Sequence, residues 1–328
     1  MRSRRPSCGM AVAKRGPRAE CVPLVRASKV QIVLNSTIAT TSCRPLRPCE
    51  QCRPNPFEVA VRVALLLLVI GLTGASTGCQ AMRPKDIVDW SPDQAVLPTA
   101  EFVGNSVKVS NIRNCDYRTA DDYVVRHYDK TFDLSQVKSV DFFVVPFPEE
   151  PKLAHTMLSF GFEGNQHLGV SVEIRKRKGQ TYDPVKGMMN EYQLMYVVAD
   201  EHDLIGLRAN YRKNDVYMYP GKATPEQCRA LFVDVMHRVE DLSKKPEYYH
   251  TITNNCTTNI AKHINDIAPG RIKYDYRVLL PGYSDELAYE LGLIDNSLPF
   301  EQTRERARIT EVAYIVRDAP DFSTQIRR

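Results

Sequence analysis

The amino-acid sequence predicts an α+β fold, in which an antiparallel sheet packs against a few helices. Segments with the alternating or β-branched pattern of strands fill residues 105–220, and helical patterns dominate after residue 224. Strands grouped early and helices grouped late are typical of α+β folds rather than of alternating βαβ units. A single domain over 105–325 is the most economical division of this part of the chain.

Strand patterns recur through the first half of the predicted domain. The predicted strands are 105–114, 121–134, 139–147, 154–163, 167–177, 192–200 and 215–220. The third, SVDFFVVPF, is β-branched and aromatic, which indicates a buried strand, and Pro148 ends it. The fourth and fifth form a hairpin around Gly164 and Asn165. A turn is expected at Asp129 and Lys130, inside the second segment.

Helical patterns follow. The predicted helices are 224–245, 255–268 and 284–294. The first has Thr224 as its N-cap, Pro225 at the first helical position and Gln227 three residues after the cap. Its apolar residues recur every fourth position, and Cys228 falls near this apolar stripe. Cys228 is therefore expected to be a buried, inert thiol.

The net positive charge of the chain comes from its first part. Residues 1–58 hold 11 Lys and Arg against three acidic residues, whereas 79–328 hold 32 basic and 36 acidic residues, a net charge of −4. The basic isoelectric point therefore says nothing about nucleic-acid binding. Because no basic patch is interleaved with aromatic residues, no nucleic-acid partner is expected.

Residues 1–58 show no apolar period and are rich in Arg, Pro, Ser and Cys. This composition predicts either a disordered leader or a segment that is not translated, because the start codon has been assigned too far upstream. A start just after residue 58 would leave a compact export signal. Cys49 and Cys52 have the spacing of half a zinc site, but no second pair with matching spacing follows, so no metal is expected.

Residues 59–78 are predicted to be a lipoprotein signal peptide. Arg62 precedes an apolar run of about ten residues, too short for a membrane-spanning helix of ~20. The run ends in STGC, which resembles the lipobox of bacterial lipoproteins, although Ser76 stands where an aliphatic residue is usual. The resemblance implies cleavage before Cys79 and lipidation of its thiol, which anchors the protein to the membrane on the periplasmic side of the cell envelope. An ordinary secretory signal is the alternative, and residues 79–104, with three prolines, are interpreted as a tether.

The stretch HTITNNCTTNIAKHIN places a cysteine where a polar run becomes an amphipathic helix. Asn254 or Asn255 is a natural N-cap, which puts Cys256 in the first helical turn. There, unpaired backbone N–H groups and the positive helix end favour a thiolate and could stabilise an oxyanion. A small buried residue at a helix start is the alternative interpretation.

A nucleophilic thiol needs a base. His263 is seven residues from Cys256, about 10 Å along the helix axis, which is too far for a hydrogen bond. The two candidates that remain, His155 and His167, lie on the paired strands of the predicted hairpin. His155 is preferred because it opens its strand after a Pro- and Glu-rich loop. Glu173 on the next strand could orient an imidazole, and so could His167.

Five motifs stand in order along the predicted domain: AHTMLSFGFE, VSVEIRKRKGQTY, YVVADEHDLIGLR, TNNCTTNIAKHIN and LLPGYSDELAYELGLID. Together they resemble the bacterial family of the Lnb N-terminal periplasmic domain. That family is similar to circularly permuted papain-like (NlpC-like) thiol proteins, including lecithin–retinol acyltransferase, in which the histidine strand precedes the cysteine helix. The resemblance implies a permuted papain-like domain with Cys256 as nucleophile and His155 as base. The resemblance does not identify a third catalytic residue in this sequence. Glu173 is selected for that role on strand-face geometry.

These features predict an envelope lipoprotein that forms a thioester on Cys256, as an acyltransferase or hydrolase without a cofactor. The resemblance favours lipid or lipoprotein acyl transfer, and Asn254 or Asn255 could help helix N–H groups to hold the oxyanion. The alternatives are a peptidoglycan amidase or peptidase and a non-catalytic envelope binding or assembly lipoprotein. The expected partners are the bacterial membrane, through the lipid on Cys79, and an envelope lipid, lipoprotein or peptidoglycan substrate. A metal site from Cys256, His250 and His263 is not expected, because their spacing does not bring them together.

The signal peptide yields the first testable prediction. Globomycin treatment, or a Cys79→Ala change, should leave an unprocessed and mislocalised precursor, detected by its mobility on a gel and by cell fractionation. Normal processing in both cases would make the protein a periplasmic protein without a lipid anchor.

Overall fold

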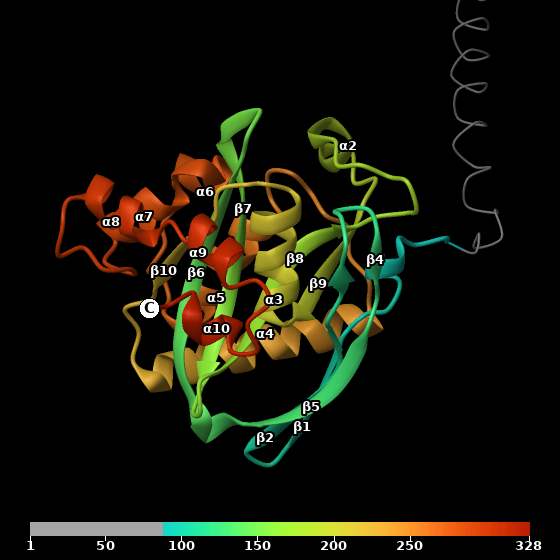
Figure 1. Ribbon diagram of the computed structural model, residues 1–328, viewed down its shortest axis with the longest axis horizontal. Helices are drawn as coiled ribbons and strands as arrows, with labels where there is room; N and C mark the ends of the chain where they lie inside the picture. Colours follow the sequence, from blue (N-terminus) through green and yellow to red (C-terminus); the bar gives the residue numbers. More distant parts are fainter. Residues whose placement is uncertain (1–87) are drawn as a thin grey trace, which may run out of the picture. The chain divides into compact units, whose positions relative to one another are not determined.

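A mixed sheet of eight strands organises residues 88–328, which are the part of the chain that the computed structural model describes (Figure 1). Its order is β1-β2-β9-β8-β7-β6-β10, with β5 paired to the other edge of β2. The bounds are β1 Thr99–Val103, β2 Ser106–Arg113, β5 His127–Asp133, β6 Val137–Phe147, β7 Glu150–Phe162, β8 Gln166–Arg175, β9 Gln193–Ala199 and β10 Tyr217–Pro220. A separate two-stranded sheet pairs β3 Asp116–Tyr117 with β4 Tyr123–Val124. Cys79 and the predictions for residues 1–78 lie outside the described residues.

Helices follow and interrupt the strands. Their bounds are η3 Pro92–Gln94, η4 Leu134–Gln136, α2 Pro184–Met188, α3 Glu201–Gly206, η5 Leu207–Tyr211, α4 Pro225–Lys244, α5 Cys256–Ile267, α6 Tyr276–Leu279, η6 Pro281–Tyr283, α7 Ser284–Glu290, α8 Phe300–Ala307, α9 Thr310–Ile315 and α10 Phe322–Gln325. The predicted α+β class is confirmed. The expectation of a wholly antiparallel sheet is wrong at one contact, because β2 meets β9 in parallel through the pair Arg113 and Ala199.

Local signals explain the best-predicted elements. The capping box at Thr224 and Gln227 starts α4, as expected. The β7–β8 hairpin turns at Gly164 and Asn165, both with positive φ, which glycine and asparagine adopt most readily. The predicted turn inside 121–134 is wrong, because β5 runs through it and pairs with β2.

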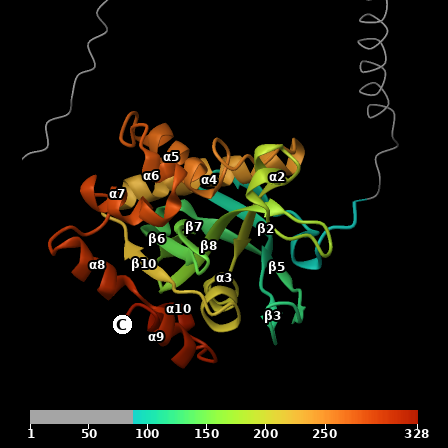
Figure 2. The same cartoon turned by 90° about the horizontal axis from the view of Figure 1, so that it is seen from above.

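The sheet separates two layers of helices. Figure 2 shows α4 and α5 on one side of β6, β7 and β8, and α3, α9 and α10 on the other. Strand alternation divides the side chains of β7 accordingly: Leu158 and Phe160 pack with α4, whereas Met157 packs in the cluster beneath α3 and α10. The two faces of the sheet therefore have separate cores.

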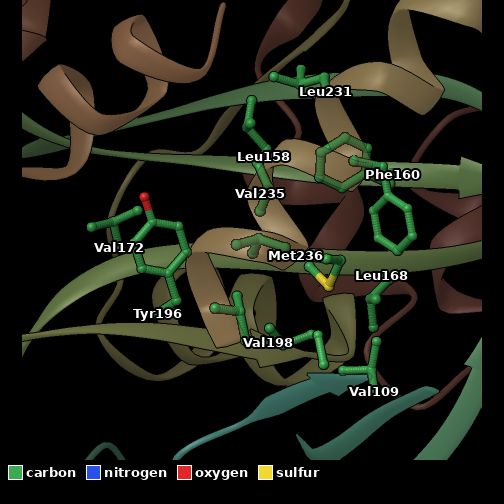
Figure 3. Close-up of a cluster of buried hydrophobic side chains, with 14 of the residues drawn as sticks. Val109, Leu158, Phe160, Leu168, Val172, Tyr196, Val198, Leu231, Val235 and Met236 are labelled. Atoms are coloured by element: carbon green, nitrogen blue, oxygen red, sulfur yellow. The ribbon is translucent and has the colours of Figure 1, made fainter. Parts of the chain in front are cut away.

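The larger core lies between the sheet and α4. Its side chains include Leu158, Phe160, Val172, Tyr196, Leu231, Val235 and Met236 (Figure 3). Cys228 is wholly buried in the same cluster, and burial raises the pKa of its thiol to about 11, as expected for an inert cysteine.

The C-terminal helices hold the protruding end of the β6–β7 hairpin. In η6, Gly282 lies against the start of β7, where a Cβ atom would stand 2.0 Å from the carbonyl oxygen of Pro151. Only glycine permits this approach of the two backbones. The contact fixes the strand end that carries His155.

Phe160 provides a test of the core. Its ring is fully buried and packs edge-on against Phe232 at 5.1 Å between ring centroids. Phe160→Ala should reduce the free energy of unfolding by about 3–5 kcal/mol in urea denaturation, because it removes buried area and leaves a cavity. The control Tyr274→Ala, at a ring that is 90% exposed, should change it by less than ~0.5 kcal/mol. Equal effects would contradict this placement of the core.

Candidate active site

A cavity of about 810 Å³ opens at the end of the sheet where β7 begins and β8 ends. Its lining includes Cys256, His155, Glu173, Arg208 and Asn255, which come from α5, β7, β8, η5 and the loop before α5. The structure thus places the predicted nucleophile, base and orienting carboxylate around one space.

The helix α5 begins at Cys256, as its sequence predicts. Asn255 is the N-cap: its side chain accepts a hydrogen bond from the N–H of Thr258, and the Thr258 hydroxyl accepts one from the N–H of Asn255. The amide of Asn255 also donates to the carbonyl of Thr251, and that of Asn254 donates to the carbonyl of Tyr248. Both asparagines therefore hold the loop and helix start, and the first-turn N–H groups are the donors best placed for an oxyanion.

The Cys256 sulfur lies against β7. Sγ is 3.9 Å from the carbonyl oxygen of Ala154 and 3.7 Å from the hydroxyl of Thr257, and the residue is 6% exposed. The Thr257 hydroxyl is 3.0 Å from that of Thr156, which ties α5 to the strand. The sulfur therefore sits beside the backbone of the residue that precedes His155.

His155 is held by a chain of polar contacts. Its Nε2 is 2.7 Å from the Ser171 hydroxyl, which donates to the Glu173 carboxylate, also at 2.7 Å. Because the single hydroxyl proton goes to the carboxylate, the serine oxygen accepts from Nε2–H of His155. Nδ1 is then the unprotonated nitrogen and the one that can accept a proton.

Burial and charge keep this imidazole neutral. Desolvation, reinforced by the Arg208 guanidinium, lowers the pKa of His155 to about 3. Burial alone would raise the pKa of Glu173, but the Arg208 guanidinium, 2.8 Å away, holds it well below its usual range. Gln94 donates to the other carboxylate oxygen at 3.0 Å. The site therefore combines an ionised carboxylate with a neutral histidine at physiological pH.

The sheet opens between the cysteine and histidine positions. The ladder of β7 and β8 stops at the pair Met157 and Ser171, so the two strands are not paired at His155 and Glu173. His155 lies on the face of Met157, whereas Cys256 packs in the core of the opposite face. The cavity reaches side chains of both faces through this gap.

Sulfur and imidazole do not share a hydrogen bond in this arrangement. Among residues 88–328, the polar contacts of Cys256 Sγ are to Ala154 and Thr257, and those of the His155 ring are to Ser171 and Glu173. The structure brings the two groups to one cavity but leaves each engaged with other partners.

The other histidines considered for the site lie elsewhere. His167 is at the opposite end of the hairpin, paired with Gly161, about 20 Å along β7 from His155. His250 stands in the turn before α5, where its Nδ1 accepts from backbone N–H groups. His263 is buried between Asp234 and Tyr196, at 2.6 and 2.7 Å.

Sequence reasoning did not assign Ser171, Arg208 or Gln94 to the site. The signal for Ser171 was its place two residues before Glu173, on the same strand face. Arg208 and Gln94 arrive from distant segments, and nothing local in the sequence marks them.

Residues 124–282 match the family model of the Lnb N-terminal periplasmic domain. This segment includes His155, Glu173 and Cys256. No curated protein and no solved structure matches the chain. Within residues 88–328, the helices all lack the length or the apolar composition needed to span a bilayer. The segment 124–282 therefore belongs to the family of the Lnb N-terminal periplasmic domain.

Proposed function

We propose that the protein is an envelope enzyme that forms a thioester on Cys256, as an acyltransferase or a hydrolase. The observation that carries the proposal is the cavity shared by Cys256 and His155, with the sulfur beside the backbone of Ala154. A thiol at a helix start and a neutral, oriented imidazole are the two groups that nucleophilic thiol catalysis needs. The periplasmic character of the family supports an envelope location.

The chemistry follows from these two groups. Sγ of Cys256 attacks an ester or amide carbonyl while its proton passes to Nδ1 of His155, and the carbonyl oxygen becomes an oxyanion. The tetrahedral intermediate collapses to a thioester, and the leaving alcohol or amine takes the proton from His155. An acceptor amine, alcohol or water then loses a proton to His155 and attacks the thioester. The second tetrahedral intermediate collapses to the product, and the expelled thiolate takes the proton back from His155, which restores the thiol and the neutral base. First-turn N–H groups of α5 stabilise both oxyanions.

Catalysis in this scheme requires a rotation of the Cys256 side chain. Its sulfur must leave the Ala154 carbonyl and turn through the gap between β7 and β8 toward His155. Catalytic hydrogen bonds often tighten only when substrate binds, so the resting contacts are compatible with this step.

Acyl transfer is favoured over peptidoglycan cleavage by a second cavity of about 250 Å³. Thr257, the residue after Cys256, lines it, and most of its other walls are apolar, among them Leu158, Ile260 and Ile264. A hydrocarbon chain attached through a carbonyl at Cys256 suits such a space, whereas a peptidoglycan stem would expose polar groups to it. Lipid or lipoprotein acyl groups are therefore the proposed donors.

The order of the two groups also supports a relationship with permuted papain-like proteins. The histidine strand β7 precedes the cysteine helix α5, and the helix packs on β7. Ser171 and Glu173 occupy the orienting role that such sites require.

A non-catalytic binding or assembly role is the second candidate. It is favoured by the resting state of Cys256, which is 6% exposed and, among the described residues, contacts Ala154 and Thr257 rather than His155. In that case the cavity would bind its ligand without covalent chemistry.

Trapping the intermediate separates the two candidates. Intact protein incubated with phospholipid vesicles should gain the mass of one acyl group on Cys256, and muropeptides should give no adduct. His155→Ala should slow the gain by about 10²-fold or more, because it removes the base. Cys256→Ala should abolish the gain, whereas Cys228→Ala, at a thiol buried in the core, should retain it. Absence of an adduct with either donor would favour the binding role, and an adduct with muropeptides alone would reverse the substrate assignment.

The charge environment of His155 yields a pH prediction. A general base acts when unprotonated, so a pKa lowered to about 3 keeps His155 active as the pH falls through 6.5. The acidic limb of kcat/KM, measured with a p-nitrophenyl ester, should therefore lie below about pH 5. Arg208→Met removes a cation that lowers this pKa and should move the limb to higher pH.

The control is the double variant Arg208→Met with Glu173→Gln, which leaves no unpaired charge in the buried site and should return the limb toward the wild-type position. A wild-type limb near the ordinary histidine pKa would show that the desolvated His155 is not the base.

A further inference from the structure

Two loops beside the cavity form a projecting lobe, made of residues 176–191 and 248–253. Thr251 joins them: its hydroxyl donates to the carbonyl of Pro184 at 2.8 Å, and its N–H donates to the carbonyl of Gly187. The rings of Tyr182 and Tyr249 meet edge-on, with centroids 6.1 Å apart. Figures 1 and 2 both show α2, which belongs to this lobe, at the periphery of the ribbon.

The lobe exposes an unusual share of apolar surface. It holds six of the 13 large hydrophobic residues that are exposed in the described part of the chain, namely Tyr182, Val185, Met188, Met189, Tyr248 and Ile252. The inner side of α2 is formed by Gly187, where a Cβ atom would stand 2.3 Å from the Thr251 hydroxyl. The apolar residues of α2 therefore face outward and add nothing to the core, which indicates an interaction surface.

Positive charge accompanies this apolar surface. Lys176, Arg177, Lys178 and Lys186 belong to the lobe, and none of them forms a salt bridge within residues 88–328. The lobe also holds two acidic residues, Asp183 and Glu191, so its formal net charge is +4 − 2 = +2. The Asp183 carboxylate caps α2 by accepting from two backbone N–H groups. Apolar side chains flanked by unpaired cations are the composition that binds anionic lipid surfaces.

The lobe also borders the candidate active site. The run from Lys176 to Tyr182, together with Tyr249 and Thr251, lines the cavity that contains Cys256. A surface bound by the lobe would therefore meet the rim of that cavity.

We propose that this lobe docks the protein on an anionic lipid bilayer, with its apolar side chains in the interface and its four cations at the lipid phosphates. A second copy of the chain is a poorer occupant, because a two-fold contact would bring the same cations face to face. Docking presents the rim of the cavity to the membrane surface. The proposal does not depend on thioester chemistry, since Cys256→Ser should bind lipid as the wild type does.

The test measures lipid contact at one residue of the full chain. Met189→Trp and Ile315→Trp place a reporter at two sites of similar exposure, 67% and 75%, with Ile315 in α9 as the matched control. Vesicles contain brominated phosphatidylcholine, alone or with an equal amount of phosphatidylglycerol. Tryptophan at 189 should be quenched severalfold more than at 315 in the mixed vesicles, after subtraction of the wild-type signal from Trp90. Val185→Trp is the second reporter if Met189→Trp is poorly folded.

Charge variants test the anionic part of the proposal. With the 189 reporter, Lys178→Gln or Lys186→Gln should each lower the apparent partition coefficient about five-fold, which is the effect of one cation near an anionic surface. The control Lys108→Gln, on β2, should leave it unchanged. Quenching at 189 no greater than at 315 would overturn membrane docking. Equal quenching in neutral vesicles, unaffected by the lysine changes, would overturn the choice of an anionic lipid surface.

Discussion

The site depends on where the pairing of β7 and β8 ends. Beyond Met157 and Ser171, β7 stays paired only with β6 and β8 only with β9, so the sheet opens at His155 and Glu173. An intact ladder would close this space with backbone hydrogen bonds and separate the two faces of the sheet. Because the ladder stops, a cavity forms that reaches both faces, and the contact of Gly282 with Pro151 holds the freed end of β7 in place.

A largely buried ion pair, Arg208 with Glu173, lies at the opening, and its main effect is on His155. Arg208 and Glu173 are separated by 2.8 Å, and the remaining carboxylate positions accept from Ser171 and Gln94. A buried ion pair contributes little net stability, because desolvation of both charges offsets their attraction. Its clearer consequence is electrostatic: the carboxylate orients Ser171, the serine fixes the tautomer of His155, and the guanidinium helps to keep that ring unprotonated.

The parts that sequence predicts well are those with local causes. The capping boxes at Thr224 and Asn255 start α4 and α5 because side chains within one turn satisfy the free N–H groups. The turn expected inside 121–134 fails because the pairing of β5 with β2 overrides local turn preference. Arg208 was not predictable, because it reaches Glu173 from 35 residues away along the chain through the packing of α3 and η5. The gap between β7 and β8 has no sequence signal either, since both strands keep an ordinary alternation past the point where they part.

The two faces of the sheet offer different surroundings to a molecule held at Cys256. On the α5 side, Thr257 lines a mostly apolar cavity, whereas the cavity that contains Cys256 also has polar and charged side chains in its wall, among them His155 and Arg208. A substrate with a hydrocarbon tail and a polar head would find suitable surroundings in both cavities. A wholly polar peptide would leave the apolar cavity without a suitable partner. The proposed membrane docking of the lobe is consistent with this division, because amphiphilic molecules concentrate at the lipid surface that the lobe would contact.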